Sequence, residues 1–290
     1  MCGAALLMAC AATATAKDTG SWKDEAISPV ANPLFFESPL IQSELRPLFV
    51  YHKIADSFIG GFARVYAVQA RWAVNDRLAI IATKDGYIDL QPKGLAHDEG
   101  WADLSAGVKY ALIDDEARQF ILTPGVKIEL PTGETDAFQG NGSSELDVFV
   151  SAMKGWDKFH ATASIGARVP LDLDEETASL HYSLQLDYAT CKYFIPFVTL
   201  NGFTVLSEGD GGFDTLPSPL DLQALNAVEG YDIINFGAST SGGESQVAVG
   251  LGFRSKVHKN LDLGFAWEKG ITSPRGIFDE RFTVDAVVHF

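Results

Sequence analysis

Large apolar residues recur at every second position along most of the chain, from Leu48 to Phe290. This is the period of a β-strand and not that of a helix. The clearest run of alternating apolar residues is Leu180, Tyr182, Leu184, Leu186 and Tyr188. The positions between them carry charges, glycines and small polar residues, deep inside the runs. Because strands of a soluble sandwich also alternate, strand length has to decide between a sandwich and a membrane barrel.

The alternating runs are about 12–14 residues long, whereas strands of globular proteins usually have about 5–6 residues. At about 3.3 Å per residue and a tilt of about 40°, such a run rises roughly 30 Å, the thickness of a hydrocarbon core. No stretch approaches the ~20 consecutive apolar residues of a membrane helix, so a membrane-spanning chain of this kind has to be a closed barrel. The sequence therefore predicts an all-β fold, a transmembrane antiparallel up-and-down β-barrel.

Turn residues divide the barrel into about twelve strands, an even number that puts both chain ends on the periplasmic side. The predicted strands are 45–54, 62–74, 77–89, 102–113, 119–130, 144–155, 158–170, 178–189, 193–206, 245–257, 261–271 and 278–290. Short turns such as Asn75-Asp76 alternate with longer connections such as 131–143. Aromatic residues near strand ends, among them Trp72, Trp101 and Trp156, predict girdles at the two lipid interfaces.

The predicted barrel covers 44–290 and includes one long external loop, 207–244. The segment from Tyr231 to Ser239 also alternates, but counting it as a barrel strand would make the number odd. We therefore place it inside the loop, as a hairpin arm or as a fold into the barrel mouth. The same loop holds a predicted short helix from Pro219 to Val228, because Ser218 can cap it and proline fits a first helical turn.

The first residues have the character of an export signal. Residues 1–16 are predicted to be a signal peptide, because 3–16 is small and apolar and Ala14-Thr15-Ala16 fits a cleavage site before Lys17. The basic start of such a signal is missing. A lipoprotein signal at Leu7-Met8-Ala9-Cys10 and a plain apolar tail are the alternatives.

Residues 17–43 connect the predicted signal to the first strand. Pro29, Pro33 and Pro39 oppose a regular element in this stretch. We predict either a periplasmic N-terminal segment or a small plug that enters the lumen, and the residues alone leave both open.

The final strand ends on an aromatic residue, Phe290. The apolar residues at alternate positions before it are Phe282, Val284, Ala286 and Val288. This ending resembles the signal that the barrel-assembly machinery reads in outer-membrane proteins. We therefore expect that machinery as a partner, the bacterial cell outer membrane as the location, and outer-membrane lipids and lipopolysaccharide around the barrel.

The formal net charge is −16, which argues against nucleic acid as a partner because nucleic-acid binding requires basic patches. The acidic residues gather in predicted loops, such as 172–176 and 208–214. These loops are either a solvated rim, or a vestibule that attracts cations or binds lipopolysaccharide through divalent ions. Neither a phosphate-binding loop nor a zinc spacing is present, so we expect no cofactor and no metal.

Charged residues at the positions opposite to the apolar ones are expected to face the lumen. We predict these lumen-lining residues: Arg71, Lys109, Lys127, Glu129, Arg168, Asp187, Arg254, Asp262, Glu268 and Arg281. They either pair across strands and fill the barrel or line a polar path, and we expect a mixture. Lys109, Lys127 and Arg168 are the first choices for a path. His160 and His181 also face inward, but near opposite ends of adjacent strands, which does not favour a catalytic serine–histidine pair.

Two consecutive strands carry a more specific motif. Gly100-Trp101-Ala102-Asp103-Leu104 opens one strand, and Leu130-Pro131-Thr132-Gly133 ends the next. The pair resembles a barrel family named for transport in the meta-pathway of phenol degradation, which has a G-x-G/A-D-L strand before a strand ending in L-P-T-G. That family is loosely related to hydrophobic-compound transporters typified by the long-chain fatty-acid channel. The motif covers only these strands, and the resemblance implies small hydrophobic or aromatic solutes and no catalytic residues.

These features predict an outer-membrane channel or transporter that takes up small molecules passively, with hydrophobic or aromatic molecules as the implied class. Selection would follow from lumen width and charge, without covalent chemistry, so we do not expect an enzyme. The first alternative is a closed structural or adhesive barrel acting through the 207–244 loop. The second is a barrel enzyme that modifies lipids, which would need a nucleophile and a base at the same depth.

Overall fold

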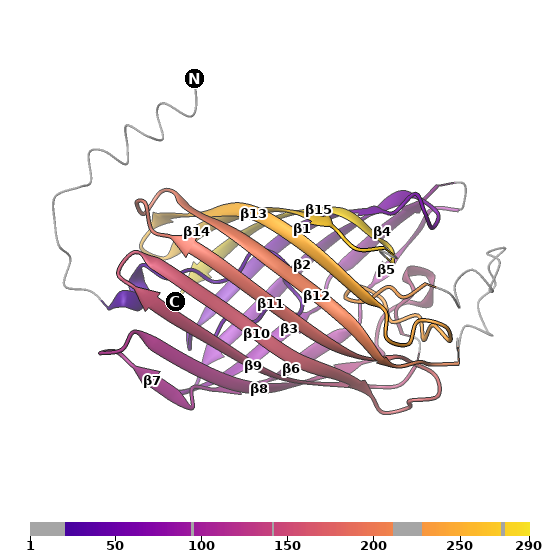
Figure 1. Ribbon diagram of the computed structural model, residues 1–290, viewed down its shortest axis with the longest axis horizontal. Helices are drawn as coiled ribbons and strands as arrows, with labels where there is room; N and C mark the ends of the chain where they lie inside the picture. The colour runs from indigo at the N-terminus through magenta and orange to yellow at the C-terminus, as the bar shows by residue number, and fades with distance from the viewer. Residues whose placement is uncertain (1–20, 94–95, 141, 211–227, 274–275) are drawn as a thin grey trace, which may run out of the picture.

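One antiparallel sheet closes on itself into a barrel (Figure 1). The computed structural model describes residues 21–93, 96–140, 142–210, 228–273 and 276–290. The strands are β1 (Glu44–Ile54), β2 (Gly61–Ala73), β3 (Leu78–Lys84), β4 (Tyr87–Pro92), β5 (Asp98–Trp101), β6 (Leu104–Tyr110), β7 (Ile113–Asp115), β8 (Phe120–Leu130), β9 (Glu145–Trp156), β10 (Phe159–Pro170), β11 (Ala178–Tyr188), β12 (Ile195–Ser207), β13 (Ser245–His258), β14 (Leu261–Gly270) and β15 (Phe278–His289). Two 3-10 turns, η1 (Trp22–Asp24) and η2 (Thr135–Ala137), accompany them.

The barrel closes because β1 pairs with β15 on one side and with β2 on the other. Over the described ranges the 15 strands form 12 barrel strands. The difference arises because β3 and β4 are two parts of one strand, and β5, β6 and β7 are three parts of the next. The predicted twelve-stranded up-and-down barrel is therefore confirmed. Among the residues described, no helix combines the length and the apolar character needed to cross a membrane.

The two faces of the barrel wall differ in chemistry, as the alternation predicts. In β9, Glu145, Asp147 and Ser151 are buried on the inner face, whereas Val148 and Val150 are exposed on the outer face. Neighbouring strands repeat the pattern, so the outer face is a band of exposed aliphatic and aromatic side chains. An apolar outer band and a polar interior are what a lipid-embedded barrel requires.

The two ends of the barrel differ in the length of their connections. In Figure 1 the chain end at Phe290 lies at the end of the barrel that carries the short turns, such as 157–158. The opposite end carries the longer connections, among them 131–144 and 208–244. This arrangement follows the predicted alternation of turns and loops. We refer to the two ends as the turn end and the loop end.

Several predicted features of the ends lie outside the described residues. These are the signal peptide at 1–16 and the helix at 219–228, except for Val228 itself. The segment from Tyr231 to Ser239 is described and is not a strand. Instead, Ile233, Ile234 and Phe236 pack into an apolar cluster at the loop end, which agrees with the predicted fold into the barrel mouth.

Two neighbouring strands of the barrel wall are interrupted at the same level. Residues Asp85-Gly86 separate β3 from β4, and Ala102-Asp103 separate β5 from β6. The backbone N–H of Val68 therefore lacks a strand partner and donates instead to Asp85 Oδ1 at 3.0 Å. Gly86 has φ +106°, and a Cβ there would lie 2.3 Å from the Tyr66 carbonyl oxygen, so only glycine fits. We call this place the wall break.

Candidate functional site

All the predicted lumen-lining residues face the inside of the barrel. Seven of the ten make an ion pair with a described residue, and Asp187 and Asp262 contact the imidazole rings of His160 at 2.9 Å and His289 at 3.2 Å. The exception is Glu268, which accepts hydrogen bonds from the backbone N–H of Asn32 at 3.2 Å and from Asn201 Nδ2 at 2.8 Å. Pairing therefore dominates over an open lining in this structure, and a role in solute passage stays a prediction for these residues.

Residues 21–43, here called the inner segment, lie inside the barrel. Trp22 packs near the turn end with Ile121 and Met153. The chain then reaches the middle of the lumen, where the ring of Phe35 lies 4.9 Å from His181 and 5.4 Å from Phe203 between centroids. It returns to the turn end, where β1 begins. The inner segment is thus enclosed by side chains from strands all around the barrel.

The inner segment is held mainly through its backbone carbonyl groups. Cations of the wall donate to them at alternate or nearby residues: Lys256 Nζ to Asp24 and Ala26, Arg254 Nε to Ser28, Arg46 Nη2 to Val30, Lys127 Nζ to Leu34 and Lys109 Nζ to Ser38. The donor–acceptor distances run from 2.5 to 3.4 Å. Hydrogen bonds from charged donors are stronger than neutral ones. These contacts hold the backbone of the inner segment and do not depend on the identity of its side chains.

Side chains of the inner segment also bind the wall, among them Lys23, which pairs with Asp114, and Asn32, which donates to Ser183 Oγ at 3.2 Å. The most extensive of these contacts are those of Glu37. Arg71 donates from Nε and Nη2 to the two carboxylate oxygens of Glu37, at 2.9 and 2.7 Å. Lys109 Nζ donates to Glu37 Oε1 at 2.7 Å. Arg71 also lies 3.3 Å from Glu44 Oε1. The side chains of Glu37, Arg71, Lys109 and Glu44 are at most 4% exposed, so this is a fully buried carboxylate site.

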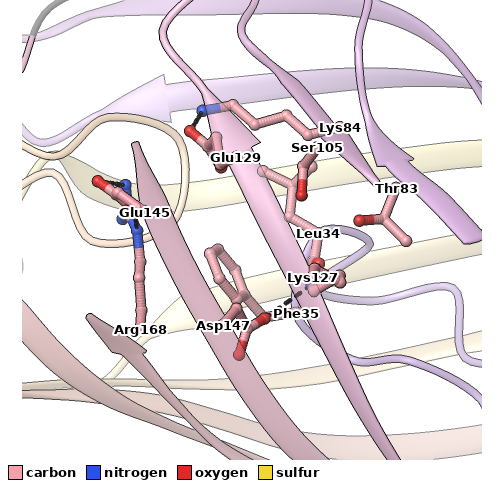
Figure 2. Close-up of a pocket in the computed structure, with 10 residues that line it drawn as sticks. All are labelled: Leu34, Phe35, Thr83, Lys84, Ser105, Lys127, Glu129, Glu145, Asp147 and Arg168. Atoms are coloured by element: carbon pink, nitrogen blue, oxygen red, sulfur yellow. Dashed lines mark hydrogen bonds and ion pairs between the residues drawn. The ribbon is translucent and has the colours of Figure 1, made fainter. Parts of the chain in front are cut away.

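A second group of ion pairs lies between Phe35 and the loop end (Figure 2). It comprises Lys84 with Glu129, Lys127 with Asp147 at 2.8 Å, and Arg168 with Glu145. These side chains and Phe35 line a cavity of only about 10 Å³. Such a volume holds about one water molecule, so the pairs fill this side of the lumen.

Residues 228–241, here called the mouth segment, cover the loop end. The carboxylate of Glu229 accepts from the backbone N–H groups of Gly230 at 2.8 Å and Phe236 at 3.0 Å, and from Thr177 Oγ1 at 3.0 Å. Burial raises the pKa of Glu229 above its usual range, although these hydrogen bonds oppose the shift. Asp232 ties the mouth segment to the wall through an ion pair of 2.5 Å with Arg281.

The loop 171–177, at the loop end, adds a second perturbed carboxyl group. Glu176 accepts from the backbone N–H of Ser143 at 2.9 Å and lies against Glu145. Burial and the neighbouring charge of Glu145 raise the pKa of Glu176 to about 8. Its protonated form can donate to Glu145, which holds the loop against the barrel at neutral pH.

An apolar cavity of about 40 Å³ lies in the lumen beside the inner segment. Its lining includes Pro33, Leu34, Leu48, Val50, Val65, Ala67, Ile88, Ala102 and Ile233. A larger hollow of about 660 Å³ lies on the outer face at the wall break, where Tyr66, Trp101 and Leu104 are exposed. Leu48, Ala67, Asp85 and Ala102 line both spaces. The lumen cavity and the outer hollow therefore lie on either side of the same four residues at the wall break.

Several residues of the site were missed by the sequence analysis. Lys84 lies inside because a bulge between Ala82 and Lys84 breaks the alternation of β3. No period-2 pattern could have placed it. Arg46 alternates with Leu45 and Pro47 in the first strand, so the pattern was sufficient to find it. Glu37 lies in an irregular segment, where alternation gives no information.

Among the residues that the structure describes, no group of three or more His, Cys, Asp or Glu side chains could hold a metal ion. His160 and His181 each contact their own aspartate, Asp187 at 2.9 Å and Asp147 at 2.8 Å. The two histidines therefore belong to separate pairs.

Comparison with known proteins supports the fold. No protein-family model and no curated relative matches the sequence. Solved structures do match: the COG4313 outer membrane channel from Pseudomonas putida F1 superposes with a TM-score of 0.63 at 13% identity, over 91% of this chain and 100% of that chain. The NanC porin gives 0.51 at 8% identity, over 86% and 99%. The translocator domain of the autotransporter NalP from Neisseria meningitidis gives 0.51 at 10%, over 87% and 90%.

The chain thus has the fold of bacterial outer-membrane β-barrels, a class that includes channels and porins. At these identities the likeness concerns the fold alone. The resemblance to the phenol-degradation family stays a prediction.

Proposed function

We propose that this protein is a channel of the bacterial outer membrane that lets small hydrophobic or aromatic molecules pass without covalent chemistry. The similar channel and porin structures support a channel role. The apolar outer band supports a location in a lipid bilayer, because such a band would be unstable in water.

The observation that carries the proposal is that only a thin layer of shared residues separates the lumen cavity from the outer hollow at the wall break. Both spaces are lined mostly by apolar side chains, so an apolar solute gains free energy on leaving water for either one, about 25 cal/mol for each Å² of apolar surface. A polar solute would lose its hydration without a matching set of partners. The geometry favours hydrophobic solutes that move between the lumen and the bilayer.

A closed structural or adhesive barrel is the second candidate. It is favoured by one observation, namely that the inner segment and the mouth segment together fill the lumen from the turn end to the loop end, with Phe35 and Tyr231 packed in the same apolar cluster. In the channel proposal the same segments are mobile closures, whereas in the structural proposal they are permanent fillings.

Uptake of radiolabelled naphthalene by porin-deficient Gram-negative cells that produce this chain tests the proposal. We expect at least fivefold faster uptake than in cells without it. Ala67→Phe places a ring at the wall break and should abolish most of the gain. Ala70→Phe, on the outward side of the same strand, is the matched control. Equal uptake with and without the protein, at confirmed barrel levels, would favour the structural barrel.

A further inference from the structure

The buried site around Glu37 has the chemistry of a carboxylate receptor. Arg71 offers two parallel N–H groups, the arrangement in which arginine recognises a planar carboxylate, and Lys109 adds a third donor. We propose that Arg71 and Lys109 bind the carboxylate of small aromatic monocarboxylates, and that Glu37 occupies their site as an internal substitute that such a solute displaces. This rests on the proposed channel function and names its solute class.

The charges at this site explain why the displacing group should be an anion. If Glu37 moved away, Arg71 would keep Glu44, which lies 3.3 Å away. Lys109 would lose both the Glu37 carboxylate and the Ser38 carbonyl, its only hydrogen-bond acceptors among the described residues. A buried ammonium group without a partner costs several kcal/mol. Release of the inner segment is therefore least costly when another carboxylate takes the place of Glu37.

The wall next to the site presents an apolar surface on which a ring could pack. The inward residues of β2 change from Val65 and Ala67, which line the apolar lumen cavity, to Gln69 and then to Arg71. Gln69 lines the cavity and accepts a hydrogen bond from Arg71 Nη2 at 3.2 Å. Two residues of strand correspond to about 7 Å. The cavity of about 40 Å³ is smaller than a phenyl ring needs, but Pro33 and Leu34 of the inner segment line it and would leave together with Glu37. A phenyl ring in the enlarged space could then carry its carboxylate to Arg71 on a linker of a few atoms.

The inner segment itself joins aromatic rings to a carboxylate. Phe35 and Phe36 immediately precede Glu37, and both rings are buried. Lys127 Nζ lies 5.0 Å from the centre of the Phe35 ring and Arg168 Cζ lies 5.7 Å from it, distances at which a cation is attracted to a ring face. The lumen thus already holds an aromatic group beside a bound carboxylate, which favours an aromatic over an aliphatic acid.

Calorimetric titration of the refolded full chain in detergent micelles tests the proposal. The probes are 3-phenylpropionate, its uncharged analogue 3-phenylpropanol, and octanoate. We expect 3-phenylpropionate to bind at least tenfold more tightly than either of the others. Glu37→Gln should strengthen its binding at least fivefold, because a neutral amide competes less well for Arg71 and Lys109. Lys109→Gln should weaken it at least tenfold.

Lys256→Gln is the matched control. Lys256 also holds the inner segment through carbonyl groups, but it lies at the turn end away from the carboxylate site. Its variant should keep the preference for the acid over the alcohol. Heat-modifiable migration on gels verifies that each variant folds, and if Lys109→Gln fails to fold, Glu37→Gln decides the question.

Equal binding of the acid and the alcohol, or a Glu37→Gln variant that binds the acid no better, would overturn the carboxylate site. Equal binding of octanoate would overturn the aromatic preference. If the chain takes up naphthalene but binds 3-phenylpropionate no better than 3-phenylpropanol, the channel function would still be supported and the carboxylate site would be contradicted. If the barrel binds 3-phenylpropionate but does not support uptake of naphthalene, the channel function would be contradicted instead.

Discussion

Asp285 offers the sharpest test of how the barrel interior is stabilised. Its carboxylate accepts from Arg46 Nε at 2.6 Å and from Arg254 Nη1 and Nη2 at 3.0 and 2.9 Å. The side chains of Asp285 and Arg254 are 0% exposed and that of Arg46 is 2% exposed. Asp285→Asn keeps the size of the side chain but removes the only carboxylate within ion-pair distance of either arginine in the described chain. Breaking a buried ion pair in this way costs roughly 3–5 kcal/mol.

Equilibrium unfolding in guanidinium, with the barrel in lipid vesicles and tryptophan fluorescence as the signal, measures this loss. Asp89→Asn is the control, because Asp89 pairs with the partly exposed Arg64 at 3.1 Å and such pairs contribute only about 0–1 kcal/mol. If Asp285→Asn lowered the free energy of unfolding by no more than Asp89→Asn does, water would already hydrate the lumen arginines, and the description of a dry, paired interior would be wrong.

Three further predictions concern the ends of the barrel. The pKa of Glu176 is about 8 in the folded chain, against an ordinary value of 4.5. The free energy of unfolding should therefore fall by roughly 5 kcal/mol as the pH rises from 4.5 to 8, with no further loss at higher pH. Glu176→Gln should flatten this decline in pH-dependent unfolding, and an unchanged decline would contradict the assignment. Glu229→Ala leaves buried backbone N–H groups without an acceptor, which costs about 1–3 kcal/mol for each group. Hydrogen exchange at the Phe236 amide should therefore become at least tenfold faster. Unchanged exchange would show that Glu229 does not hold the mouth segment. Phe290→Ala should lower the amount of folded barrel recovered from cell outer membranes severalfold, without affecting refolding in detergent. Equal recovery of the variant and the unchanged chain would contradict the proposed recognition by the assembly machinery.

The barrel itself could be predicted because membrane insertion imposes a simple rule on the sequence. Lipid requires apolar side chains on the outer face, whereas the lumen tolerates polar ones. Because side chains of a strand alternate between the two faces, this difference appears in the sequence as a period of two. The run from Leu180 to Tyr188 shows it, and β11 (Ala178–Tyr188) contains this run. The inward position of Arg71 or Arg254 follows from the same rule.

The closure of the lumen could not be predicted in the same way. The inner segment has no period, because its contacts are made by backbone carbonyl groups and not by a repeating side-chain pattern. Its position depends on the wall cations Arg46, Lys109 and Lys256, which surround it only in the folded barrel. The wall break was hidden for a related reason, since the bulge at Lys84 suspends the alternation just where the strand is interrupted.

The central claim is that the barrel encloses a passage which the inner segment closes. Conductance in a planar bilayer tests it most directly, with the refolded chain compared with a variant that lacks residues 21–39. We predict that the complete chain is almost always closed and that the shortened barrel gives stable conductance steps of defined size. A shortened barrel that still shows heat-modifiable migration and yet conducts no ions would contradict the claim and identify a structural barrel.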